Sequence, residues 1–278
     1  MKIGFIGAGK VGTNLGRYFD TKGWPLSGFY SKHYEDAIFS ARQTNSHAFS
    51  ELSECVAVSD WLFITVPDDQ LLTVWQEVEP LLTREYCLFH CSGSKSSAIF
   101  ATEKAQIACF SLHPLTAFAT KSVPLEQLTQ VAFTLEGDQQ QTQVQAAFAN
   151  LENPLAVISA EDKSLYHAAG IFASSLVVGL ATTAQEIFQT CGLPEAFAKS
   201  AWRQVFTQNA MNLVLNGPKE SLSGPIEEND LTSIIEHLAV LSPEDAKIYC
   251  ELTKKLIKLA AEKYPERDYQ FIEEKIDQ

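Results

Sequence analysis

Residues 1–12 read MKIGFIGAGKVG, and this stretch decides the fold. Ile3–Ile6 predicts a short buried strand, and the residues after it follow the pattern G-x-G-x-x-G. Between a strand and a helix, the first glycine makes a tight turn, the second admits a pyrophosphate, and the third lets the helix pack on the strand. The helix N-terminus adds free N–H groups for the anion. The stretch therefore predicts a dinucleotide site made by Gly7, Ala8, Gly9, Lys10, Val11 and Gly12.

Apolar runs alternate with helix-like segments through the first half of the chain. Further strands are predicted at Pro25–Tyr30, His47–Phe49, Trp61–Val66, Tyr86–His90, Ala108–Leu112 and Val131–Leu135. Helices are predicted after the glycine turn, at Tyr34–Thr44, from a cap at Asp68 or Asp69 to about Leu82, and at Gln139–Leu151. This alternation predicts a parallel sheet covered on both faces, a doubly wound Rossmann domain over residues 1–153.

The pattern changes in the second half. After a short run at Leu155–Ile158, helices are predicted at Glu161–Thr190, Glu195–Asn216, Asp230–Leu241, Pro243–Lys263 and Tyr269–Lys275. The expected fold class is therefore α/β, with the N-terminal doubly wound Rossmann domain followed by an all-α C-terminal domain over residues 154–278.

Composition disfavours several classes of partner. The formal net charge of −13 argues against nucleic acid and anionic membranes as partners, and ordinary solubility is the favoured explanation of the acidity itself. Six cysteines without a CxxC pair and an N-terminus unlike a signal peptide predict reduced thiols in a cytoplasmic protein. No cluster has the spacing of metal ligands, so no metal is expected.

The segment between Lys163 and Glu186 carries no charge and is long enough to span a bilayer. Its polar residues are too many for a lone span, so a buried central helix is expected instead. This helix is apolar on most faces and needs more cover than one small domain gives. The sequence therefore predicts a homodimer formed through the helical domain.

Residues at the end of the second predicted strand indicate whether NAD or NADP binds. NAD enzymes usually carry a carboxylate there, whereas this chain has Ser31, Lys32 and His33. A hydroxyl and a cation suit a 2′-phosphate, which predicts NADP bound by Ser31 and Lys32. Glu35 and Asp36 lie just beyond and keep NAD as the alternative. Farther along, Val66, Pro67 and Asp68 end the fourth strand. In folds of this kind, the end of that strand lies beside the nicotinamide half of the bound cofactor.

Other polar residues follow strands at the edge where doubly wound folds bind ligands. The Ser92-Gly93-Ser94 turn can present hydroxyl and N–H groups to a substrate carboxylate, or it is a plain strand-to-helix turn. His113 follows the sixth strand and either points into the cleft or is a buried histidine bonded to backbone.

Lys163 and His167 lie four residues apart, on one helix face with Gly170, Ile171 and Ser174. Hydride transfer to a carbonyl or imine needs a donor for the developing charge, and a lysine in a partly dry cleft can supply it. Lys163 and His167 are therefore the catalytic candidates, with Ser174 near the substrate. The alternative is a solvated Lys163 and a core His167.

Taken in order, several motifs resemble those of a known family. They are Gly7–Gly12, Val66-Pro67-Asp68, Ser92-Gly93, His113-Pro114-Leu115, KSLYHAA at residues 163–169 and LSGPI at residues 222–226. Over nearly the whole chain this set resembles bacterial NADP oxidoreductases that join a Rossmann-like domain to a helical domain of unassigned function. It is more distantly similar to the 6-phosphogluconate dehydrogenase-like superfamily, which includes 3-hydroxyisobutyrate dehydrogenases, ketopantoate reductases and pyrroline-5-carboxylate reductases.

The resemblance implies an NADP(H)-dependent oxidoreductase that transfers a hydride between nicotinamide and a small carbonyl or imino compound. A 2-oxo acid such as ketopantoate is one candidate, and Lys163 matches the superfamily's catalytic lysine, with His167 one turn on. Two departures put the substrate in doubt: Ser175 stands where relatives have Asn, and Glu227-Glu228-Asn229-Asp230 replaces an Arg-Gly-Asp-like segment. The rival hypothesis is a non-catalytic redox-sensing or regulatory protein that binds NAD(P).

Overall fold

The structure is a computed structural model that describes residues 1–137 and 141–277. Its contacts divide the chain into two compact units, Met1–Ser174 and Ser175–Gln278. The described part of the first unit contains an eight-stranded sheet in the order β3-β2-β1-β4-β5-β6-β7-β8. Its strands are β1 (Ile3–Ile6), β2 (Leu26–Tyr30), β3 (His47–Phe49), β4 (Trp61–Ile64), β5 (Tyr86–His90), β6 (Ile107–Pro114), β7 (Phe133–Gly137) and β8 (Leu155–Val157).

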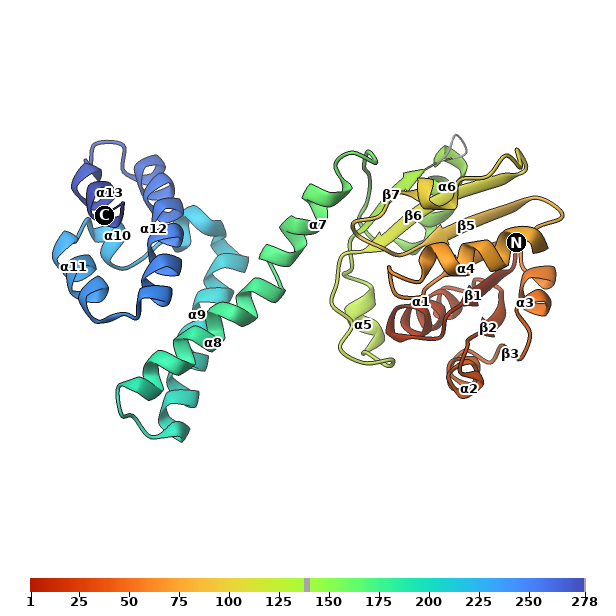
Figure 1. The fold of residues 1–278 in the computed structure, drawn as a ribbon, viewed down its shortest axis with the longest axis horizontal. Helices are drawn as coiled ribbons and strands as arrows, with labels where there is room; N and C mark the ends of the chain where they lie inside the picture. The colour runs from red at the N-terminus through yellow and green to blue at the C-terminus, as the bar shows by residue number, and fades with distance from the viewer. Residues whose placement is uncertain (138–140, 278) are drawn as a thin grey trace. The chain divides into compact units, whose positions relative to one another are not determined.

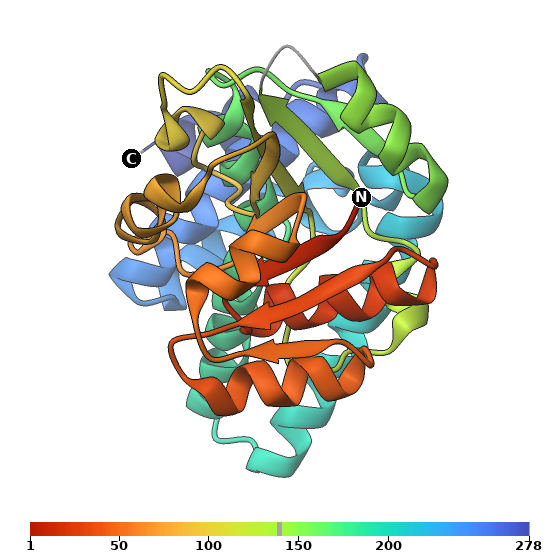
Figure 2. The ribbon, with the colours of Figure 1, turned by 90° about the vertical axis from the view of Figure 1, so that its right-hand side faces the viewer.

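Helices cover both faces of this sheet (Figures 1 and 2). The helices of the first unit are α1 (Lys10–Thr21), α2 (Tyr34–Gln43), α3 (Leu52–Val58), α4 (Leu71–Val78), α5 (Leu125–Leu128), α6 (Gln141–Phe148) and α7 (Lys163–Phe172). Short 3₁₀ turns lie at Glu79–Leu81, Ser97–Phe100 and Ala149–Leu151. Alternate residues of β4 enter different cores: Phe63 packs into one cluster, whereas Leu62 and Ile64 pack into the other. The doubly wound α/β prediction is confirmed.

The order β3-β2-β1-β4-β5-β6 is that of a Rossmann sheet, and each neighbouring pair within it is parallel. The expectation of a wholly parallel sheet is wrong beyond β6, because β7 pairs antiparallel with β6. Strand direction depends on how the connecting chain returns to the sheet, which hydrophobic runs do not encode. The added strand β8 then pairs parallel with β7.

A ladder of phenylalanines fixes the register of the five central parallel strands. Phe29, Phe5, Phe63, Phe89 and Phe110 are paired residue by residue across β2, β1, β4, β5 and β6. Successive ring centroids lie 4.9, 5.3, 4.6 and 5.3 Å apart in stacked orientations. Such cross-strand aromatic pairs resist a register slip, so the carboxyl ends of these strands finish along one edge.

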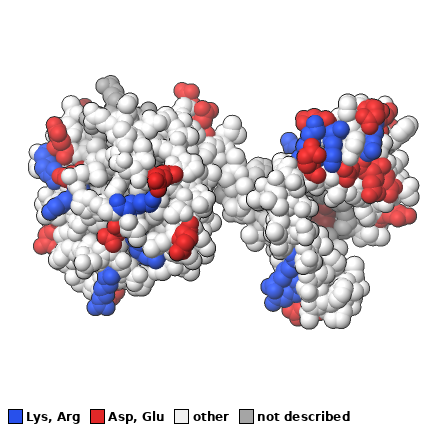
Figure 3. Space-filling view, turned by 180° about the vertical axis from the view of Figure 1, so that it is seen from behind, with Lys and Arg blue, Asp and Glu red and all other residues white. Residues whose placement is uncertain are grey.

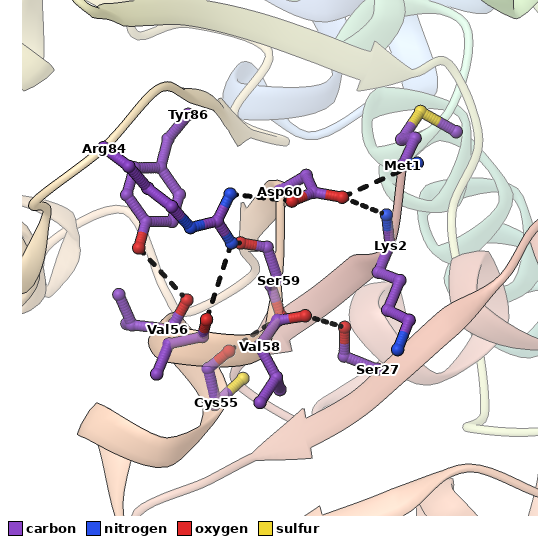
Figure 4. Close-up of polar contacts among 11 residues, drawn as sticks. Met1, Lys2, Ser27, Cys55, Val56, Val58, Ser59, Asp60, Arg84 and Tyr86 are labelled. Carbon is purple, nitrogen blue, oxygen red and sulfur yellow. Dashed lines mark hydrogen bonds and ion pairs between the residues drawn. The ribbon is translucent and has the colours of Figure 1, made fainter.

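The amino-terminal edge of the sheet is closed by an ion-pair cluster, shown in Figure 4. The Asp60 carboxylate accepts a 2.7 Å hydrogen bond from Nη1 of Arg84 and a 2.8 Å bond from the backbone N–H of Lys2. The Met1 ammonium lies 3.6 Å from Asp60, and the Arg84 guanidinium lies 4.6 Å from the ring centroid of Tyr86. These groups neutralise one another's charges at this edge of the sheet.

Most predicted elements of the first unit match the structure, with differences at α3, α5 and the starts of α4 and α6. Helices α3 and α5 were not predicted, because their seven and four residues are too few for a clear helical period. The cap predicted at Asp68 or Asp69 is wrong, because Gln70 occupies the N-cap position of α4. Of the helix predicted at Gln139–Leu151, α6 and its 3₁₀ turn are seen, while Gln139 lies outside the described residues.

The second unit is helical, with α8 (Ser175–Thr190), α9 (Glu195–Ser221), α10 (Pro225–Glu228), α11 (Leu231–Val240), α12 (Pro243–Lys263) and α13 (Gln270–Ile276). Helix α9 contains a kink at Gly217, whose φ of 78° is left-handed and is followed by Pro218. The hydrophobic core of the second unit comprises Leu222, Ile226, Ile234, Ile257, Ala260, Tyr269, Ile272 and Ile276. The strand β8 and the helix α7, which follow the predicted boundary at 153/154, belong to the first unit.

The single helix predicted at Glu161–Thr190 is two helices, α7 and α8, separated by Ala173 and Ser174. The stretch Lys163–Thr190 is long and apolar enough to cross a membrane by length and composition. The expectation that it is buried is also wrong within the chain: Lys163 is the buried residue of α7, and no residue of α8 is buried. Figure 3 shows acidic and basic side chains interspersed on the surface of the first unit rather than gathered in a patch of one sign.

Candidate active site and nucleotide pocket

The glycine turn has the geometry that its sequence predicts. Gly7 has a φ of 103°, a backbone conformation that residues other than glycine rarely adopt. A Cβ atom on Gly12 would lie 2.3 Å from Oγ1 of Thr65 and 2.5 Å from the carbonyl oxygen of Gly7. The Thr65 hydroxyl donates a 2.7 Å hydrogen bond to that same carbonyl. Gly12 therefore lets α1 pack against the ends of β1 and β4, as predicted.

A cavity of about 740 Å³ lies at the carboxyl edge of the sheet, between the glycine turn, the end of β2 and α4. Seven of the residues predicted to bind cofactor line it, namely Gly7, Ala8, Gly9, Ser31, Lys32, Val66 and Pro67. Lys10, Val11, Gly12 and Asp68 are not in this lining. The first three open α1, where N–H groups have no intrahelical carbonyl to bind. One wall of the cavity was not predicted from the sequence, namely the wall that α4 and its N-cap supply through Gln70, Thr73, Val74 and Glu77.

These features fit a dinucleotide without adjustment. Gly9 is the N-cap residue of α1 and has no side chain to occupy the space before the helix N-terminus. An anion in that space would meet free N–H groups and the positive end of the helix dipole. Ser31 and Lys32 would then lie at the ribose end of the cavity, as doubly wound folds bind dinucleotides across the sheet.

One of the two carboxylates that kept NAD open as an alternative, that of Asp36, is paired. Nζ of Lys121 lies 2.6 Å from Oδ1 of Asp36 at the start of α2. Lys32 is exposed and forms no ion pair with the residues that the structure describes. The Lys121 cation neutralises Asp36, which removes a charge that would repel a 2′-phosphate.

Beside this cavity, Lys163 is fully buried. Its ammonium donates a 2.7 Å hydrogen bond to Oγ of Ser111 on β6 and a 3.2 Å bond to the carbonyl oxygen of Ser92. The alternative of a solvated lysine is therefore wrong, and the environment is drier than the partly dry cleft expected. Burial lowers the pKa of Lys163, and the carboxylates of Glu136 and Asp68 partly offset this effect.

The Ser92-Gly93-Ser94 turn uses its polar groups internally. The Ser92 hydroxyl donates to Oδ2 of Asp68 at 2.6 Å and accepts from the backbone N–H groups of Ser94 and Lys95. Gly93 lies beneath two imidazoles, since a Cβ atom there would lie 2.4 Å from Cδ2 of His167 and 2.9 Å from Nε2 of His113. These bonds are those of a local turn, the plainer of the two expectations, and they tie β5 to the end of β4.

His113 and His167 meet over Gly93, with ring centroids 6.1 Å apart and planes at 80°. Nδ1 of His113 lies 2.9 Å from the hydroxyl of Tyr166, so His113 is bonded to a side chain rather than to backbone. Burial lowers the pKa of His113 to about 4, with Lys163 and His167 adding to the effect. At neutral pH the His113 imidazole is therefore uncharged.

Four contributors to this cluster were not assigned roles from sequence: Tyr166, Ser111, His90 and Glu136. Tyr166 follows Lys163 by three residues, and Ser111 precedes His113 by two, so helix and strand periods could have linked them. Glu136 is an acid within an apolar strand, and it accepts hydrogen bonds from the Ser97 N–H and hydroxyl at 2.7 and 2.9 Å.

His90 ends β5 and is completely buried. Its Nδ1 accepts a 3.2 Å hydrogen bond from the backbone N–H of Ser92. Burial and the nearby Lys163 ammonium lower the pKa of His90 to about 4.

Ser174 does not join this cluster. Its hydroxyl donates a 2.7 Å hydrogen bond to the carbonyl oxygen of Gly170 in its own helix, and Ser174 is exposed. Ser175, which opens α8, is exposed as well.

The departures at residues 227–230 have local structural roles in the second unit. The Glu227 carboxylate lies 2.7 Å from Nζ of Lys263, and the Asp230 carboxylate caps α11 through the N–H of Ser233 at 3.1 Å. Asn229 adopts a left-handed conformation with a φ of 57° and bonds the Asp268 carbonyl through its side chain. Local interactions within the second unit therefore account for Glu227, Asn229 and Asp230.

Comparison with known proteins gives two family matches. Residues 2–86 match the family described as NADP oxidoreductase, coenzyme F420-dependent, and residues 131–256 match a domain of unknown function, DUF2520. No curated protein matches the chain at a significant level of sequence similarity.

Solved structures resemble the chain over nearly its whole length. A Thermotoga maritima protein is 26% identical, with a TM-score of 0.71, covering 94% of this chain and 98% of its own. A pyrroline-5-carboxylate reductase from Coxiella burnetii is 16% identical with a TM-score of 0.57, covering 95% and 97%. An imine reductase from Myxococcus stipitatus in complex with NADP⁺ is 16% identical with a TM-score of 0.59, covering 100% of both chains.

The glycine turn, the nucleotide cavity and these matches agree with one another. Residues 2–86 are therefore similar to NADP oxidoreductases and residues 131–256 to the DUF2520 family, and these matches support an NADP-dependent oxidoreductase.

Proposed function

We propose that the protein reduces a small carbonyl or imino compound, with a 2-oxo acid such as ketopantoate as one candidate. NADPH, when bound, supplies the hydride. The observation that carries this proposal is the hydrogen bond between Asp68 and Ser92, 2.6 Å long. It joins the end of β4, beside the nucleotide cavity, to the turn that lies under His113 and His167.

Lys163 has an electrostatic role in this proposal. Its buried ammonium lies beneath the turn and the two imidazoles rather than at an open surface. Negative charge that develops on a substrate oxygen above the turn is stabilised by a fixed cation in a low-dielectric surrounding. His167 is half-buried, and its ring nitrogens form no hydrogen bond with described residues, so it remains available to a substrate.

Oxidation of NADPH, followed by its absorbance, tests this function with a panel of 2-oxo acids that includes ketopantoate, together with cyclic imines and simple aldehydes. Turnover of at least one class is expected, and Lys163→Met should abolish most of it. NADPH binding without turnover of any compound in the panel would contradict the proposal and would favour a sensing role.

We also propose that a second copy of the chain covers the long helices. No residue of α8 is buried, and in α9 the buried residue is Ala198. Exposed apolar side chains of this pair include Leu176, Val178, Leu180, Phe197, Val205, Phe206, Met211, Leu213, Val214 and Leu215. Soluble proteins rarely leave so large an apolar surface uncovered, and homodimers commonly bury such faces. Polar residues such as Thr182, Thr183 and Gln185 favour a protein partner over lipid, in keeping with a cytoplasmic enzyme.

A further inference from the structure

Tyr166 lies one helical turn after the buried Lys163, and its hydroxyl contacts His113. The hydroxyl oxygen lies 2.9 Å from Nδ1 of His113, with ring centroids 5.5 Å apart and planes at 89°. Tyr166 is half-buried, and burial raises the pKa of its phenol. The phenol therefore keeps its single hydrogen at neutral pH and has it available to donate.

The strand next to β6 supplies the second contact of this phenol. Thr134 on β7 is the residue directly opposite His113 in the antiparallel pair. Its buried hydroxyl has no hydrogen-bond partner of good geometry in the described chain, but it faces the phenol and opposes the rise in the Tyr166 pKa. Nδ1 of His113 is an acceptor within hydrogen-bond distance of the phenol, at 2.9 Å, so we assign the phenol hydrogen to this bond.

Several groups hold His113 uncharged. Burial is the largest cause of its lowered pKa, Lys163 and His167 act in the same direction, and Asp68 opposes them. The charged and titratable groups around it are Lys163, Tyr166 and His167 on α7, Asp68 after β4, and His90 on β5. A neutral imidazole carries one hydrogen, so an Nδ1 atom that accepts a bond from Tyr166 leaves that hydrogen on Nε2.

Nε2 of His113 is the atom that faces the turn. It lies beside Gly93 and toward His167, and it forms no hydrogen bond with the residues that the structure describes. An N–H group at this place, next to the end of β5, points where a substrate carbonyl oxygen or imine nitrogen would lie in the proposed reaction.

We propose that Tyr166 is a positioning residue that fixes His113 in the Nε2–H tautomer, and that His113 donates a hydrogen bond through Nε2 to the substrate atom that gains charge. This assignment rests on the proposed reductase function for its substrate, but the tautomer is a property of the protein alone. In this tautomer His113 acts as a neutral electrophile. The Tyr166–His113 pair then supplies a directed hydrogen bond to the substrate, which neither Lys163 nor the glycine turn supplies.

The test is a long-range ¹⁵N–¹H spectrum of the histidines in the full-length protein, without ligand and with NADP⁺, with His113→Gln used to assign the His113 signals. His113 is expected as a single neutral Nε2–H tautomer at pH 7. Tyr166→Phe keeps the ring but removes the donor, so His113 should become a mixture of tautomers. In Lys163→Met the pKa of His113 should rise, because a nearby cation is lost.

The chain offers a matched control in its second unit. Nδ1 of His237 lies 3.0 Å from the hydroxyl of Tyr249, with the rings at 80°. Tyr249→Phe should alter the His237 signals and leave those of His113 unchanged.

Kinetics on a compound that the wild-type enzyme turns over add a second readout. Tyr166→Phe should lower kcat by about tenfold, the effect expected from one lost hydrogen bond, and leave the KM for NADPH unchanged. An Nδ1–H tautomer in the wild type, or a tautomer unaffected by Tyr166→Phe, would overturn the proposal even if the enzyme reduces carbonyls. Conversely, absence of turnover with the expected tautomer would refute the reductase function and leave the Tyr166–His113 geometry standing.

Discussion

The ammonium of Lys163 lies 2.7 Å from the hydroxyl of Ser111, and both side chains are completely buried. This pair joins α7 to β6 and sets a positive charge beneath the proposed substrate site. The nearest carboxylates act on it from a distance rather than through an ion pair, since none of the ion pairs in the described chain includes Lys163. A buried cation in this setting is available to stabilise charge on a substrate.

Lys163→Met should lower kcat and kcat/KM together. Methionine keeps much of the stem volume and removes the charge, and loss of one such electrostatic group typically costs about 10²–10³ in rate. NADP⁺ affinity should hardly change, because the pyrophosphate contacts are backbone groups of the glycine turn. Stopped-flow rates measure this, with the exposed Lys255→Met on α12 as the control. A folded, cofactor-saturated Lys163→Met enzyme within about threefold of the parent would exclude Lys163 from the mechanism.

Lys32→Ala should weaken NADP⁺ binding by about 1–3 kcal/mol, the scale of one charge-assisted contact, and leave NAD⁺ nearly unchanged. Calorimetric titration with both nucleotides measures the difference. Lys2→Ala removes an equal charge at the amino-terminal edge of the sheet and serves as the control. Equal losses for both nucleotides, or tighter NAD⁺ binding by the unmodified protein, would disprove the role of Lys32.

Lys121→Gln should also shift the preference away from NADP⁺, because it releases the Asp36 carboxylate at the start of α2. An unpaired charge near the surface acts on a 2′-phosphate with about 1 kcal/mol, so a loss of roughly fivefold in NADP⁺ affinity is expected. The double variant Lys121→Gln with Asp36→Asn should recover the parent value. If the double variant binds as weakly as Lys121→Gln alone, the loss comes from the loop and not from Asp36.

Stability should fall on acidification because of His90. Its folded-state pKa is about 4 against an ordinary value of 6.5, so the unfolded chain binds more protons between these values. The neutral His90 therefore contributes to the free energy of unfolding above pH 6.5. This contribution is lost as the pH falls toward 4, and the loss is about 3 kcal/mol at most. Urea unfolding at pH 7.5 and pH 5 measures it. His90→Asn keeps an acceptor for the Ser92 N–H but does not titrate, so its loss of stability should be smaller. Equal losses in the two proteins would contradict the assignment.

Val214→Glu should convert the proposed dimer to a monomer. Val214 on α9 is 86% exposed, and a charge there must be desolvated if a second copy covers this face. Sedimentation velocity at micromolar concentration measures the state. Val240→Glu on α11 is the control, since Val240 is similarly exposed at 82% but lies outside the α8–α9 pair. A wild-type monomer across this range would end the proposal.

The sequence by itself determined most of the first unit. Short apolar runs such as Ile3–Ile6 and Tyr86–His90 are strands with the predicted bounds, because buried parallel strands need apolar residues on both faces. The glycine pattern at residues 7–12 defined the turn, because backbone conformation and close approach at Gly7 and Gly12 exclude side chains. The NADP assignment followed from a local charge at Lys32.

Tertiary structure alone decided how the polar residues meet. The antiparallel direction of β7 places Thr134 opposite His113, and the path of α7 brings Lys163 to Ser111, 52 residues away. Spacing along a helix indicated that Lys163 and His167 share a face, but it gave no depth of burial. Whether a lysine is solvated or buried, and which of two histidine nitrogens is bonded, depends on atoms contributed by distant strands, because burial and hydrogen bonding are properties of packed surfaces and not of sequence neighbours.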